Sequence, residues 1–170
     1  MSLASDLLEQ AELLSKKEPM RPKQASLRRA VSTAYYSLFH LLLEETSVVV
    51  ASGNLTVMQP LVARSLEHGV MKAIAKSFAS GWGGLPTKLK PRFTNPISAD
   101  LILVVTTFVQ LQQQRHEADY NVEERFLRAD TTRLIKDAQA AFDAWKRIRR
   151  TNEARQFLLC LLLGKSLDRS

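Results

Sequence analysis

The sequence predicts an all-α fold, an up-down helical bundle of about five to six helices, from three observations. Apolar residues recur at the three- and four-residue spacing of helices through most of the chain. Only six Gly and six Pro occur, too few for a turn-rich β-sandwich, and no segment alternates in the manner of a strand. At 170 residues, with 45% hydrophobic and 24% charged residues, we expect one globular domain over 1–170, with a loose tail from about residue 165.

Most of the expected helices have a start signal of their own. Ser2, Asp130 and Asn152 each stand where a side chain can cap a first turn, and either Asn95 or Ser98 can cap the central helix. Because proline cannot continue a helix interior, the prolines after the first helix separate it from the second. The expected helices are 2–17, 22–45, 60–79, 97–120 and 131–150, with a short last helix from 152.

The helix expected over 97–120 is the one around which the chain is organised. No residue in 101–114 is ionisable, and a helix that is apolar on most sides belongs in an interior. The polar tip RHEADY, residues 115–120, then ends it. Two pairs lie one turn apart in this tip: Arg115 with Asp119, and His116 with Tyr120. The tip is either a solvated helix end, its ion pair worth a few tenths of a kcal/mol, or a chemical site.

The helix expected over 22–45 carries a polar face beside its apolar stripe. Arg29, Thr33, Tyr36 and His40 fall at i, i+4, i+7 and i+11, along one side of a helix. Taken alone, His40 is a core histidine with one hydrogen bond, and Tyr36 is a packing residue with a polar handle. Taken with the tip at 115–120, the same residues line a site. In the next helix Arg64 and His68 are expected to form a solvated pair one turn apart.

A loop expected over 80–96 is long for a compact domain, which indicates a functional or partner-contacting segment. Trp82 stands among glycines and is followed by the cations Lys88, Lys90 and Arg92. Trp82 is suited to stack a nucleic-acid base beside a phosphate-binding patch. It is equally suited to pack into the core, and both alternatives stay open.

Charge and the absence of known motifs narrow the function classes. The formal net charge of +7 indicates polyanionic partners. Cys160 is the only cysteine, so no intrachain disulfide is possible, and a cytoplasmic setting is expected. The sequence has no zinc-ligand spacing, no Gly-rich phosphate loop, no nucleophile elbow and no dinucleotide fingerprint. We therefore expect no metal and no cofactor, and no membrane partner, since no apolar run is long enough to span a bilayer.

Metal-independent RNA cleavage needs little beyond what the polar tip offers. It needs a group that takes the 2′-hydroxyl proton, a cation for the charge developing on the phosphate, and an acid for the leaving oxygen. Arginine suits the second role because its planar fork meets two phosphate oxygens and stays charged. Histidine suits either proton role near neutral pH.

Two segments resemble motifs of HEPN-domain proteins. Residues 27–40, LRRAVSTAYYSLFH, are similar to the R-A-x-x-x-A-Y-Y-A-x-F-H helix of that family. Residues 115–121, RHEADYN, resemble the R-x-x-A-D-Y motif of its small single-domain prokaryotic group, and the likeness spans about residues 7–163. The resemblance implies a helical bundle that pairs as a homodimer and brings two copies of Arg115 into one cleft. Many such proteins are metal-independent RNases in toxin–antitoxin or defence systems, and some pair with a nucleotidyltransferase antitoxin.

The chain departs from that family at one point. Catalytic members carry Arg, four to six residues, then His, whereas Tyr120, Asn121 and Val122 hold those positions here. Two functions stay open: a homodimeric RNA-binding protein that acts as a metal-independent endoribonuclease, and a non-catalytic interaction module. For the first we expect catalytic roles for Arg115, Asp119, Tyr120 and His40, and nucleic-acid contacts from Arg29, Tyr36, His116, Lys88, Lys90 and Arg92.

Overall fold

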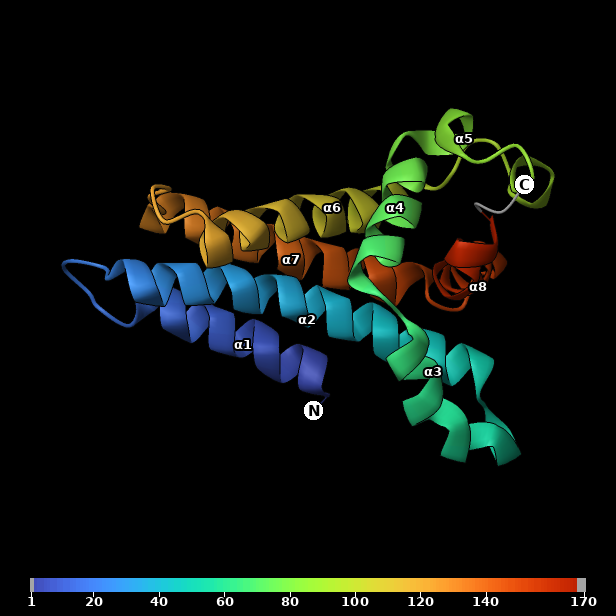
Figure 1. Ribbon diagram of the computed structural model, residues 1–170, viewed down its shortest axis with the longest axis horizontal. Helices are drawn as coiled ribbons and strands as arrows, with labels where there is room; N and C mark the ends of the chain where they lie inside the picture. Colours follow the sequence, from blue (N-terminus) through green and yellow to red (C-terminus); the bar gives the residue numbers. More distant parts are fainter. Residues whose placement is uncertain (1, 168–170) are drawn as a thin grey trace. The chain divides into compact units, whose positions relative to one another are not determined.

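A computed structural model describes residues 2–167, and Figure 1 traces its helices in sequence order. The described residues form eight α-helices and two short 3-10 helices with no strand, which confirms the all-α bundle with more helices than expected. The α-helices are α1 (Leu3–Lys16), α2 (Gln24–Val50), α3 (Gln59–Ser65), α4 (His68–Ala79), α5 (Gly81–Gly84), α6 (Ala99–Tyr120), α7 (Arg128–Ile148) and α8 (Asn152–Leu167). The 3-10 helices are η1 (Gly53–Met58) and η2 (Lys90–Arg92).

Contacts within the chain divide these helices into two compact units. Unit 1 takes in the chain up to Leu41 together with Thr107–Asp143, and unit 2 takes in Leu42–Thr106 and the chain from Ala144 onward. Helices α2, α6 and α7 each contribute residues to both units. The expectation of a single domain over 1–170 stays a prediction. Helix α8 continues to Leu167, and the last residues of the expected loose tail, 168–170, lie outside the described part.

The core of unit 1 is formed by apolar side chains at helical spacing. The apolar stripe of Leu27, Val31, Ala34 and Leu38 on α2 is fully buried, and the ring of Tyr35 lies 5.6 Å from that of Phe108 on α6, centroid to centroid. Helix α6 is not apolar on every side, however, because Gln110 and Gln113 are exposed. The buried apolar residues that α2 and α6 give to unit 1 include Leu27, Val31, Ala34, Leu38, Phe108 and Leu111.

Unit 2 has an aromatic core of its own. Phe78 on α4 lies 5.0 Å, centroid to centroid, from both Phe93 and Phe157, each in an edge-on arrangement. Trp145, at the end of α7, lies 6.5 Å from Phe157 on α8. Aromatic pairs in these arrangements stabilise a core beyond the area they bury, so α4 and α8 are held together with the loop that carries Phe93.

Gly164 on α8 allows a close approach to α4, and we predict that Gly164→Ala destabilises the protein. A Cβ atom at Gly164 would meet Val70 Cγ1 and lie 3.1 Å from Ile74 Cγ1. Overpacking of this kind costs about 1–3 kcal/mol, which urea denaturation would detect. Gly69→Ala is the matched control, because a Cβ there meets nothing within 4 Å. Equal stability of Gly164→Ala and the wild type would contradict the close approach.

Several helix boundaries differ from those predicted from the sequence. The helix expected over 60–79 is broken between α3 and α4, because Leu66 and Glu67 are extended and the Leu66 side chain is buried. Arg64 and His68 consequently lie on separate helices, so the expected pair on one helix face is wrong.

The caps were predicted in part. Ser2 accepts a hydrogen bond from the backbone N–H of Ser5, and Ser98 accepts one from that of Leu101, so both caps are confirmed. Helix α7 begins before Asp130, which therefore lies within its first turn. Helix α8 is capped by Thr151 rather than Asn152, since the Thr151 hydroxyl accepts from the Ala154 N–H at 3.1 Å.

Candidate functional site

The end of α6 and the middle of α2 together form a polar cluster in unit 1. Arg115 donates a hydrogen bond from Nη2 to the hydroxyl of Tyr36 at 2.9 Å. Its Nε lies 2.7 Å from Oδ2 of Asp119, one turn along the same helix. Ser32 of α2 donates to the other carboxylate oxygen of Asp119 at 2.5 Å. The guanidinium and its carboxylate are thus both tied to α2, one through Tyr36 and the other through Ser32.

Aromatic rings flank the guanidinium of Arg115. Its Cζ lies 5.5 Å from the ring centroid of Tyr36 and 5.6 Å from that of Tyr120, within the range of cation–π attraction. Tyr36 is half-buried, whereas Tyr120 is 64% exposed. The ring of His116 lies 5.1 Å from that of Tyr120 and is exposed. One tyrosine therefore anchors Arg115 in the fold, and the other presents an aromatic surface to solvent.

Arg115 remains a cation in this setting. Burial by itself lowers the pKa of the guanidinium, but Tyr36, Asp119 and Tyr120 more than offset this, and the pKa is raised above its ordinary value. The side chain of Arg115 is still 24% exposed. A guanidinium has five N–H groups, and the contacts with Tyr36 and Asp119 engage two of its three nitrogens, so donors remain for an incoming anion.

Tyr35 belongs to the core rather than to the site. Its ring is fully buried against Tyr36 and Phe108. Burial raises the pKa of the Tyr35 phenol well above its ordinary value, and the nearby Arg115 lowers it only in part. Tyr35 therefore stays neutral and packs beneath the site.

Two further residues expected in the site lie on α2. Arg29 is exposed and one turn before Thr33. His40 is half-buried, and its ring meets the ring of Phe39 edge-on at 5.5 Å. The catalytic role expected for His40 stays a prediction.

Arg28 is a residue whose importance the sequence did not reveal. It lies beside Arg29, but its guanidinium turns toward the end of α6 and donates to main-chain carbonyls there. The bonds to Ala118 and Asn121 are each 2.9 Å long. Helix ends leave carbonyls without intrahelical partners and favour positive charge, so Arg28 fixes the end of α6 that carries the site. The carbonyls that Arg28 contacts belong to Glu117, Ala118, Asn121, Val122 and Glu124.

The basic loop expected to bind nucleic acid belongs to unit 2 and is more structured than predicted. It contains α5 and η2, and three of its apolar side chains are buried: Leu85, Leu89 and Phe93. The ammonium of Lys90 lies 5.1 Å from the ring centroid of Trp82, which is half-buried. Lys88 and Arg92 are exposed, and Arg92 donates to the Lys88 carbonyl at 2.5 Å.

Over residues 2–167, no three His, Cys, Asp or Glu side chains are grouped so that they could hold a metal ion. Within the same residues, none of the helices combines the length and apolar character that a membrane crossing needs. Comparison of the chain with models of protein families, with curated proteins and with solved structures finds no significant match.

Proposed function

We propose that this chain is an RNA-binding protein of the HEPN type that works as a homodimer, with Arg115 as its phosphate contact. One observation carries the proposal: the guanidinium of Arg115 is held by the Tyr36 hydroxyl and by Asp119 while 24% of its side chain stays exposed. An arginine fixed in orientation loses little freedom when it binds a phosphate, and its fork meets two phosphate oxygens. The net charge of +7 favours association with a polyanion.

The aromatic side of the cluster suits single-stranded RNA. Tyr120 is 64% exposed and lies against both Arg115 and His116. A base stacked on such a ring is stabilised by about 1–3 kcal/mol. One RNA strand can place a phosphate at Arg115 and a neighbouring base on Tyr120. Arg29 on α2 adds an exposed cation in the same unit.

Exposed apolar side chains near the cluster support the homodimer. Val122 is 88% exposed and Leu127 is 64% exposed, both in the segment that joins α6 to α7. Together with Tyr120 they place three exposed apolar side chains within eight residues. Clustered apolar exposure marks interaction surfaces more often than scattered single residues do, and a second copy of the chain seated there brings two Arg115 side chains near one strand.

The test is binding of fluorescently labelled single-stranded RNA, followed by anisotropy in EDTA at rising salt. We expect saturable binding that weakens steeply with salt, because phosphate contacts release counterions. Light scattering on the protein without RNA should give twice the 19.2 kDa mass of one chain. Absence of saturable binding at low salt would contradict the proposal.

Cleavage is the enzymatic extension of the proposal. The 2′-hydroxyl attacks the adjacent phosphate, a base takes its proton, and an acid protonates the departing 5′ oxygen, which leaves a cyclic phosphate and a free 5′ hydroxyl. Asp119, Tyr120 and His40 are the candidates for the proton transfers, with Arg115 on the phosphate. Appearance of cyclic-phosphate ends in EDTA, lost in Arg115→Gln, supports the extension; intact RNA after prolonged incubation removes it and leaves binding alone.

A second candidate function is a non-catalytic interaction module, for which a nucleotidyltransferase antitoxin is the partner that the resemblance implies. The observation that favours it is the pairing of Arg115 with Asp119, since an arginine neutralised by a neighbouring carboxylate is also a structural pair. Absence of a histidine at residues 120–122 points the same way. Specific co-purification of a protein partner without RNA affinity would select this function.

A further inference from the structure

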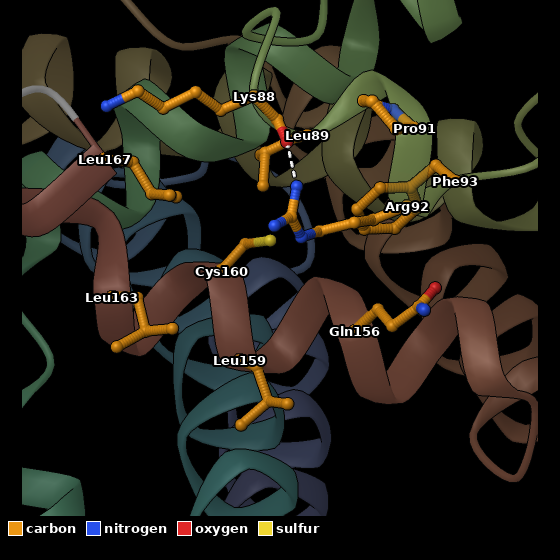
Figure 2. Close-up of a pocket in the computed structure, with 10 residues that line it drawn as sticks. All are labelled: Lys88, Leu89, Pro91, Arg92, Phe93, Gln156, Leu159, Cys160, Leu163 and Leu167. Atoms are coloured by element: carbon orange, nitrogen blue, oxygen red, sulfur yellow. Dashed lines mark hydrogen bonds between the residues drawn. The ribbon is translucent and has the colours of Figure 1, made fainter. Parts of the chain in front are cut away.

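Unit 2 contains a cavity that no residue of the Arg115 cluster lines. It lies between α8 and the segment that includes η2, and its volume of about 540 Å³ is in the range of small-molecule sites. Its floor and walls are mostly apolar. The apolar residues that line it are Leu89, Pro91, Phe93, Leu159, Leu163 and Leu167, which Figure 2 draws together with Cys160.

Two cations stand at this cavity. Figure 2 shows the side chain of Arg92 reaching across α8, with its guanidinium close to the sulfur of Cys160 and bonded to the carbonyl of Lys88. The side chain of Lys88 extends toward Leu167 in the same view. The other polar lining residue is Gln156, and among the described lining residues none carries a carboxylate. The cavity therefore joins an apolar interior to a positively charged edge.

We infer that this cavity binds a small amphiphilic carboxylate, a molecule with an unbranched apolar chain and one carboxylate end. The chain occupies the space lined by Leu89, Leu163 and Leu167, where its burial is favourable in proportion to the apolar area removed from water. The carboxylate meets Arg92, whose fork suits two carboxylate oxygens, and Lys88 adds a positive charge to the cavity lining. An uncharged molecule with the same apolar chain has no carboxylate to pair with Arg92. A molecule with a cationic end is repelled by the two cations.

The partly exposed apolar side chains of α8 support a ligand that enters from solvent. Leu159 is 40% exposed and Leu163 is 49% exposed, one turn apart, and both line the cavity. Leucines exposed at this spacing on a helix leave apolar area in water, which a bound chain would cover. The occupant is a single small molecule because the space is a cavity of limited volume beside two cations.

Cys160 provides a reporter that is independent of RNA. It is the only cysteine of the chain, it lines the cavity, and 6% of it is exposed. Burial raises the pKa of its thiol to about 11, although Arg92 lowers the pKa in part. Since the thiolate is the nucleophile, alkylation should be slow at neutral pH and should accelerate about tenfold per pH unit toward that pKa. A ligand in the cavity should slow alkylation further at any given pH.

The experiment titrates the whole chain with decanoate below its micelle concentration. Binding is followed by calorimetry and by protection of Cys160 from alkylation in alkaline buffer. We expect saturable binding of decanoate and at least about tenfold weaker binding of decanol, because a charge-assisted pair is lost. Arg92→Gln should weaken decanoate binding by a similar factor. Lys90→Gln is the matched control, since Lys90 carries the same charge in the same loop but lies on Trp82 rather than in the cavity lining.

Leu163→Glu provides a second variant that should fold, because Leu163 is 49% exposed. Its carboxylate should abolish decanoate binding while RNA binding and circular dichroism stay unchanged. No saturable binding of decanoate, or equal binding of decanol and decanoate, would overturn the inference. Binding to anionic lipid vesicles without binding to monomeric decanoate would overturn it in favour of a membrane surface, and protection of Cys160 only by a protein or peptide would overturn it in favour of a docking groove.

Discussion

Replacing Arg28 with alanine should lower the free energy of unfolding by about 3 kcal/mol. The guanidinium of Arg28 donates to the carbonyls of Ala118 and Asn121 at 2.9 Å and lies 5.7 Å from the ring centroid of Phe126. Its loss leaves carbonyls at the end of α6 without a donor and removes a cation from a helix C-terminus, where positive charge is favourable. Urea denaturation followed by circular dichroism measures the change.

Arg29→Ala is the matched control for this experiment. Arg29 is the neighbouring residue with the same side chain, but it is exposed, so its removal should change the free energy of unfolding by no more than about 0.5 kcal/mol. We expect Arg29→Ala to weaken RNA binding without loss of stability. Equal stability of Arg28→Ala and Arg29→Ala would contradict the role given to Arg28.

Arg115→Gln should weaken binding of single-stranded RNA by roughly thirtyfold, the equivalent of about 2 kcal/mol for a charge-assisted hydrogen bond. The variant removes the charge and the donor to Tyr36 while keeping a polar, helix-compatible side chain. Anisotropy titration with labelled RNA measures the affinity, and circular dichroism verifies the fold.

Two further variants separate phosphate binding from a loss of general positive charge. Arg133→Gln removes an arginine of the same unit that also pairs with an aspartate on its own helix, Asp130 at 3.1 Å, and that is 67% exposed. It should leave RNA affinity nearly unchanged. Tyr120→Leu keeps an apolar side chain at an exposed position and should cost the stacking contribution, about tenfold in affinity. If Arg133→Gln weakens RNA binding as much as Arg115→Gln does, the cluster around Arg115 has no special role in RNA binding.

Much of the fold follows from periodicity in the sequence. The stripe on α2 and the apolar run of α6 both predict buried helices, and the buried rings of Tyr35 and Phe108 agree with this. The break at Leu66 could not be predicted, because the apolar spacing continues across it and only the burial of Leu66 in the folded chain explains the extended backbone there. Helix propensity summed over a stretch of sequence is a weak guide where one buried side chain decides the backbone conformation.

The candidate site could be predicted in part. Spacing places Arg115 and Asp119 one turn apart, and the polar face of the helix expected over 22–45 marks Tyr36 as a candidate, which the folded chain joins to Arg115 by a 2.9 Å hydrogen bond. Ser32 and Arg28 could not be assigned, because their roles depend on which side of α2 meets the end of α6. The sequence does not distinguish an arginine that binds carbonyls from an arginine in solvent. Only the folded chain shows that Arg28 binds carbonyls and that Arg29 is exposed.

The salt dependence of RNA affinity tests the central claim, that Arg115 binds a phosphate, most directly. Each phosphate contact contributes roughly one unit to the slope of log affinity against log salt concentration. The account predicts that the slope of Arg115→Gln is smaller than that of the wild type by about one unit, whereas that of Arg133→Gln is unchanged. An unchanged slope in Arg115→Gln would contradict the claim and leave Arg115 as a structural partner of Asp119 alone.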